Sequence, residues 1–260
     1  MTRTLPDFYH PPAIETALGV RFTSIPRWNV FHYGLLLQAF REDYPKQELR
    51  PPLGNVMFQF PSTDTDFAGM PVRCWFINQE STELIQVQND CFLRNWRKTE
   101  NSPEYMHYEF IRPKFEHDWL KFVAFLKEHD LAAPEIWQCE VTYINHFVRG
   151  REWDDFNSLS KLYPAWRGLD NPKLLSKSQM VQFATSYQLA NDLTLQFISQ
   201  PAIRQQDGAE IIQLSVTALG RPKSSNIKDV LAWLDDGHAA VVDGFSEFTS
   251  DAAHAIWGKK

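Results

Sequence analysis

The order of strand-like and helix-like segments constrains the fold of this chain more than any single motif. Ala13–Phe22 has the two-residue apolar period of a strand, and a helix-like stretch follows, with Phe31, Leu35 and Ala39 spaced by four. In order, the first half predicts a strand at Ala13–Phe22, a helix between Pro26 and Pro45, strands at 55–60, 72–78, 84–88 and 91–96, and a helix that Pro113 begins.

The second half nearly repeats this order. It predicts a strand at 135–148, a short helix within 153–166, strands at 180–189, 193–199 and 210–219, and a long helix that starts near Ser224, Ser225 and Asn226. Asn191 and Asp192 mark a hairpin turn between two of these strands. The pattern is a strand, a helix, a meander and a helix, repeated once without residue-level identity.

These patterns predict an α+β fold with two tandem helix-grip-like halves of the TATA-binding type. In each half a curved antiparallel sheet carries a long helix packed across it. We expect the first half at 1–133 and the second at 134–260, packed as one body because no long linker separates them. A tandem pair of this type forms a saddle that can bind DNA, whereas a single helix-grip unit encloses a small molecule.

Composition narrows the class of protein. The 260 residues carry 43% hydrophobic and 14% aromatic side chains, which favours a large core rich in sheet. The net charge is -6, and a protein dedicated to binding phosphate backbones needs a basic surface. Nucleic acid is therefore disfavoured as the partner.

The cysteines and the apolar runs bear on location. Cys74, Cys91 and Cys139 are far apart, so we expect core thiols rather than a disulfide framework or a zinc ribbon. The sequence has neither an apolar signal region near its start nor 18 uninterrupted apolar residues. We expect a cytoplasmic protein without a membrane span, and homodimer formation through exposed tryptophans stays open.

Catalytic and cofactor motifs are missing from the sequence. It contains none of the patterns GxGxxG, GxxxxGK[ST], GxSxG or HExxH. The eight histidines are scattered, and His238 falls on the apolar seam of the last long helix, where a core histidine is the favoured interpretation. We expect no cofactor and no metal site, and we favour a non-enzymatic protein.

One hairpin carries the best candidate interaction patch, which is Arg94, Asn95, Trp96, Arg97 and Lys98. Strand alternation places Phe92, Arg94, Trp96 and Lys98 on one face and Cys91, Leu93, Asn95 and Arg97 on the other. The first face can stack rings and pair phosphates, or it can hold cation–π pairs on a solvated surface without any ligand.

Two further candidates lie in the strand at 135–148. Asn145 shares the apolar face of this strand with Tyr143 and Phe147, so its amide needs buried hydrogen-bond partners. Its role is either to hold a neighbouring backbone segment or to contact a ligand between sheet and helix. His146 points to the other face, where a surface histidine is the default interpretation.

Four segments together carry a resemblance to known proteins: PPAIETALGVRF, QVQNDCFLRNWRK, EVTYINHF and LDDGHAAVVDGFSEFTSDAAHAIWG. The chain resembles a sporadically distributed family of uncharacterised bacterial proteins of about this length, from Pro11 to Gly258. The resemblance gives no residue a role. The scattered occurrence that it implies is typical of mobile accessory genes, such as those of phage defence and toxin–antitoxin loci.

The favoured function is a binding or regulatory protein that acts through a protein partner or a small ligand. A phage-defence or toxin–antitoxin accessory role would follow from the resemblance. Two alternatives stay open: a nucleic-acid-binding protein that uses a saddle-like sheet, and an enzyme of unrecognised type that acts on a nucleotide or nucleic acid.

Overall fold

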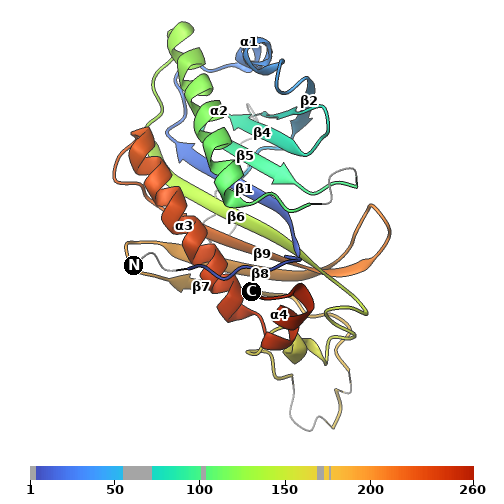
Figure 1. The fold of residues 1–260 in the computed structure, drawn as a ribbon. Coiled ribbons are helices and arrows are strands. Elements are labelled where there is room, and N and C mark those ends of the chain that lie inside the picture. Colours follow the sequence, from blue (N-terminus) through green and yellow to red (C-terminus); the bar gives the residue numbers. More distant parts are fainter. Residues whose placement is uncertain (1–3, 55–71, 101–103, 169–172, 176) are drawn as a thin grey trace. The chain divides into compact units, whose positions relative to one another are not determined.

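The computed structural model describes residues 4–54, 72–100, 104–168, 173–175 and 177–260. Within them the fold is α+β, as the sequence predicted (Figure 1). The elements are β1 (Ala13–Phe22), α1 (Val30–Phe40), β2 (Lys46–Arg50), β3 (Arg73–Ile77), β4 (Glu83–Gln88), β5 (Cys91–Arg97), α2 (Tyr108–Glu128), β6 (Ile136–Val148), a 3₁₀ turn η1 (Leu159–Lys161), β7 (Phe183–Gln188), β8 (Thr194–Ile203), β9 (Glu210–Gly220), α3 (Ile227–Phe248) and α4 (Asp251–Trp257).

The nine strands of the described chain form an open antiparallel sheet in the order β2-β3-β4-β5-β1-β6-β9-β8-β7. Contacts along the chain define two compact units. Unit 1 comprises Met1–Ala17, Cys139–Arg221 and Val230–Lys260, and unit 2 comprises Leu18–Gln138 and Pro222–Asp229. The first 17 residues thus belong to the same unit as most of the chain after Gln138.

Unit 2 buries its core between the sheet and two helices (Figure 1). Phe92 of β5 lies with its ring centroid 5.2–6.1 Å from the rings of Phe115, Trp119 and Phe122 on α2. The side chains that α1 buries are Tyr33, Leu36 and Phe40. The helical period of the sequence therefore gave the right element in α1, but its Phe31 is 79% exposed and lies outside the core.

In unit 2 one strand was not predicted, and one helix begins elsewhere than predicted. The second strand is β2 at Lys46–Arg50, because its pairing with β3 makes a strand of a segment without an apolar period. The strand predicted at 55–60 lies outside the described residues. Helix α2 begins at Tyr108, so Pro113 stands inside the helix and not at its start; its lack of an N–H costs only one bond near the first turn.

Unit 1 packs α3 across its strands (Figure 1). The rings of Phe197 on β8 and Phe248 on α3 stack at 4.2 Å, and α3 approaches β8 closely at Gly244. Helix α4, which the sequence did not predict separately, begins after the N-cap Ser250 and buries Trp257 against Phe147 of β6 at 5.4 Å. Aromatic contacts therefore hold both helices of this unit.

The short helix predicted within 153–166 is wrong, because the structure has only the single turn η1 there. The side chain of Asp155 accepts hydrogen bonds from the backbone N–H groups of Asn157 and Ser158, both at 2.9 Å. Such local side-chain bonds compete with the helical ladder. In the described part of the chain, the helices are all too short or too polar to cross a membrane.

Candidate functional site

Strand β5 divides the predicted run of Arg94 to Lys98 between two faces of the sheet. Arg94 points toward α2, where it meets Asp118. Asn95 and Arg97 point to the opposite face, where Asn95 bonds Gln86 and Arg97 lies over the ring of Trp75. Trp96 is 1% exposed, and Lys98 is exposed just beyond the strand. The alternation that the sequence predicted is confirmed, and its consequence is that these five residues do not form one patch.

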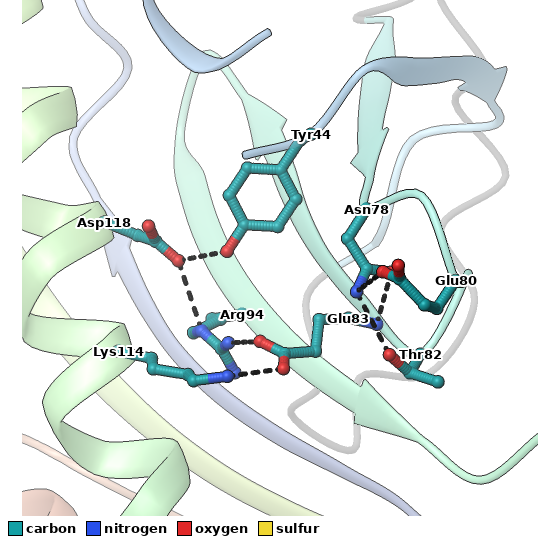
Figure 2. Close-up of polar contacts among 8 residues, drawn as sticks. All are labelled: Tyr44, Asn78, Glu80, Thr82, Glu83, Arg94, Lys114 and Asp118. Atoms are coloured by element: carbon teal, nitrogen blue, oxygen red, sulfur yellow. Dashed lines mark hydrogen bonds and ion pairs between the residues drawn. The ribbon is translucent and has the colours of Figure 1, made fainter. Parts of the chain in front are cut away.

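The face toward α2 carries a buried polar network (Figure 2). Arg94 is wholly buried, and its Nε donates to Oδ2 of Asp118 at 3.1 Å while its Nη2 pairs with Glu83. The phenol of Tyr44 donates to the same Oδ2 of Asp118 at 2.5 Å, and Lys114 pairs with the second oxygen of Glu83. Two cations therefore balance two carboxylates.

Burial is the main influence on the pKa values of Asp118 and Tyr44 in this network. Burial raises the pKa of Asp118 above its ordinary value, although the bonds from Tyr44 and Arg94 oppose the shift. Burial also raises the pKa of Tyr44, so its phenol stays a hydrogen-bond donor. Since Tyr44, Arg94 and Asp118 are committed to one another, we interpret the network as a tie between β4, β5 and α2.

The turn before β4 fixes one end of this network, as Figure 2 shows. The Nδ2 of Asn78 donates to Thr82 at 3.0 Å and to Glu80 at 3.2 Å. The backbone N–H of Glu83 donates to Oδ1 of Asn78 at 3.0 Å. The Asn78 side chain therefore sets where β4 begins and places the Glu83 carboxylate beside Arg94.

The opposite face of the sheet in unit 2 gathers three arginines on one tryptophan. The guanidinium carbons of Arg50, Arg73 and Arg97 lie 4.5, 5.5 and 5.4 Å from the ring centroid of half-buried Trp75. We define the Trp75 patch as these four residues with their amide neighbours Gln86 and Asn95. The register brings them together, because Arg50 pairs with Arg73, Trp75 with Gln86, and Leu84 with Asn95.

Gln86 is the centre of the hydrogen bonds in the Trp75 patch. Its Oε1 accepts from Nη1 of Arg73 and from Nε1 of Trp75, both at 2.8 Å, and its Nε2 donates to Oδ1 of Asn95 at 2.8 Å. Gln86 and Asn95 are only 5% and 3% exposed. These buried amides hold Trp75 and Arg73 in fixed orientations.

Positive charge in the Trp75 patch is only partly compensated. Of Arg50, Arg73 and Arg97, only Arg50 is ion-paired with a carboxylate within the described chain, and that carboxylate is Glu48. The Nε atoms of Arg73 and Arg97 have no hydrogen-bond partner there. Burial, together with the charges of Arg50 and Arg21, lowers the pKa of Arg73. The patch therefore concentrates repelling cations in a protein whose net charge is -6.

The candidates of the second half belong to unit 1. Asn145 is 3% exposed, and its Nδ2 donates at 3.2 Å to the backbone carbonyl of Leu214, its partner on β9. This is the contact of an amide that holds a neighbouring strand. His146 is half-buried with Nε2 3.4 Å from Oε1 of Gln213, and burial lowers its pKa.

His238 lies against the core of unit 1, where the sequence placed it. Its Nδ1 is 3.0 Å from the phenol of Tyr143, and burial lowers its pKa to about 4. In the described residues, no three His, Cys, Asp or Glu side chains gather as a metal site would require.

The sequence patterns did not point to Arg50, Arg73, Trp75 or Gln86 as site residues. A weak signal was present in the alternation of Arg73 with Trp75 and of Gln86 with Gln88, which gives two adjacent strands a polar face. Arg50 gave no signal, because β2 has no recognisable strand pattern. Comparison with protein families, characterised proteins and solved structures found no match to this chain.

Proposed function

We propose that this chain is a non-enzymatic binding or regulatory protein and that the Trp75 patch is the surface through which it acts. One observation carries the proposal: three guanidinium groups converge on one tryptophan ring, and the described chain supplies a carboxylate to only one of them. A bound anion would relieve this repulsion, so an anionic ligand or an anionic surface of a partner protein fits.

The fold supports a finer form of this proposal. Long helices packed across antiparallel strands fit two tandem helix-grip-like halves of the TATA-binding type. The resemblance to sporadically distributed bacterial proteins adds an accessory role in phage defence or in a toxin–antitoxin pair, and the absence of an apolar signal region in the sequence adds a cytoplasmic setting. In that setting, binding of a ligand or partner at the Trp75 patch would switch the regulatory action of the protein.

Nucleic-acid binding is the second candidate, and the combination of arginines with Trp75 favours it. Single-strand binders combine a basic track with aromatic stacking platforms. Retention of the full chain on heparin at low salt tests this candidate, because binding to phosphate backbones weakens steeply as salt rises. An enzymatic role draws less support, since Asp118 and Tyr44 are enclosed in the buried network.

Native mass spectrometry of the full chain, purified gently from its own host, tests the binding function. We expect a stoichiometric extra mass, either a small ligand or a partner protein. The double variant Arg73→Gln/Arg97→Gln should lose this mass, and Arg41→Gln, an exposed arginine on the same unit, should keep it. A chain that carries no extra mass, or a mass that persists in the double variant, would contradict the proposal.

A further inference from the structure

The Trp75 patch has the chemistry to select one kind of anion. Building on the proposed binding function, we infer that the patch binds the compact, multiply charged phosphate group of a small molecule, such as a phosphate monoester or a diphosphate. This assigns a ligand class to the site formed by Arg50, Arg73 and Arg97 around Trp75. Geometry, the choice of cation, and rigidity each point to it.

The geometry of the patch is compact, because one ring lies beside all three guanidinium groups. All three guanidinium carbons lie within 5.5 Å of one ring centroid, although they come from three different strands. A polymer with one charge per repeat is matched by cations arranged in a line along a groove. Three cations gathered around one ring instead match a single group that carries more than one negative charge.

The choice of cation also favours phosphate. Every cation on the Trp75 ring is an arginine, whose planar fork donates two parallel hydrogen bonds to phosphate or carboxylate oxygens. A phosphate monoester carries a charge of about -1.5 to -2 near neutral pH. That charge matches the two guanidinium groups, Arg73 and Arg97, that the described chain leaves without a carboxylate.

The donors of the patch are held in place before any ligand binds. The Oε1 of Gln86 accepts a hydrogen bond from Nη1 of Arg73, and the backbone carbonyl of Ser81 accepts one from Nη2 of Arg97 at 3.3 Å. Each guanidinium has five N–H donors, so several remain on both arginines after these two bonds. A rigid set of donors loses little entropy on binding, which favours a small anion.

Isothermal titration of the full chain at low salt tests the inference, with inorganic pyrophosphate as the probe. We expect one pyrophosphate per chain, and we expect Arg73→Gln and Arg97→Gln each to weaken binding by about tenfold or more. Arg41→Gln removes the same charge from an exposed site of unit 2 and should leave the affinity unchanged. Binding that both patch variants retain would overturn the inference.

A nearly isosteric variant guards against misfolding of the arginine variants. Gln86→Glu keeps the shape of the site and places a carboxylate 2.8 Å from Nη1 of Arg73, where the amide oxygen now accepts. It should abolish pyrophosphate binding while thermal unfolding shows a folded chain. Unchanged pyrophosphate affinity in this folded variant would count against the site.

Titration with two other anions tests whether the patch prefers a small phosphate compound to carboxylates and to nucleic acid. Citrate offers multiple carboxylates, and a single-stranded ten-nucleotide DNA offers a line of phosphodiesters. We expect both to bind at least tenfold more weakly than pyrophosphate. Citrate binding of equal strength would overturn the choice of phosphate, and tighter binding of the DNA would overturn the choice of a small molecule.

The inference and the proposed function can fail separately. If pyrophosphate does not bind, but the protein from its host carries a phosphate-free mass that Arg73→Gln/Arg97→Gln removes, the phosphate inference is wrong and the binding function stands. If the protein from its host is bare and pyrophosphate does not bind, both are wrong.

Discussion

The Nε of Arg94 and the Oδ2 of Asp118 lie 3.1 Å apart in the interior of unit 2, and this ion pair joins β5 to α2. Both side chains are almost completely buried, at 0% and 4% exposure. Charges in such a place are tolerated only because each has a partner. The pair therefore fixes how the helix sits on the strand, and it takes Arg94 away from any surface role.

Removal of Arg94 should be strongly destabilising. We expect Arg94→Gln to lower the free energy of unfolding by about 3–5 kcal/mol, because Asp118 and Glu83 would be left without their buried cation. Lys114→Gln is the control, since Lys114 pairs with the same Glu83 but its side chain is 46% exposed; we expect a loss of less than about 1 kcal/mol. Urea denaturation measures both, and similar small losses would contradict the buried role of Arg94.

Close packing of α3 on β8 gives a second prediction. A Cβ on Gly244 would lie 2.3 Å from Cδ2 of Leu195 and 3.2 Å from Cζ of Phe197. We expect Gly244→Ala to lower the free energy of unfolding by about 1–3 kcal/mol, because these buried side chains must move. Gly34→Ala in α1 meets nothing within 4 Å and should stabilise the chain by about 0.5–1 kcal/mol. Thermal unfolding compares the two, and stabilisation by both alanines would show that α3 has room at Gly244.

Elements whose apolar residues repeat regularly within one segment were predicted correctly from the sequence. The bounds of β1 and the long seam of α3 followed from apolar spacing within one segment. The faces of β5 were also separated correctly, because alternation is a local property of a strand. That Arg94 is buried was not foreseeable in the same way, since its partner Asp118 stands 24 residues away on a helix.

The Trp75 patch lay beyond local sequence analysis for a related reason. Its residues come from β2, β3, β4 and β5, and only the register between these strands puts Arg50 and Gln86 beside Trp75. Strand β2 has no apolar alternation, so its pairing with β3 had no signal in the sequence. A site built from cross-strand neighbours becomes visible only when the register is known.

The thiols should be inert in the folded protein. Cys74, Cys91 and Cys139 are all buried, as expected from the sequence, and burial raises the pKa of Cys74 to about 11 and raises that of Cys139 as well. Because the thiolate is the reactive form, we expect no reaction with a disulfide reagent at neutral pH in the folded state. In urea all three should react. Ala132→Cys, at an exposed position, serves as the positive control, and rapid modification of the unsubstituted folded chain would contradict this burial.

The lowered pKa of His238 should make the free energy of unfolding depend on pH. Burial lowers this pKa to about 4, from an ordinary value of 6.5. Between these values the unfolded chain binds a proton at His238 that the folded chain does not, so protonation favours unfolding. The contribution of His238 to stability is therefore complete above pH 6.5 and is lost as the pH falls through about 4. A shift of this size corresponds to about 3 kcal/mol.

His238→Gln keeps a polar side chain near Tyr143 and removes the titration. We expect the free energy of unfolding of the unsubstituted chain to fall more steeply than that of His238→Gln between pH 7 and pH 4, measured by urea denaturation at each pH. The carboxylates titrate in both proteins and cancel in the difference. His10→Gln, at an exposed histidine of unit 1, should follow the unsubstituted chain. Parallel curves for His238→Gln and the unsubstituted chain would mean that His238 is protonated in the folded state, and that water reaches the space between Tyr143 and α3.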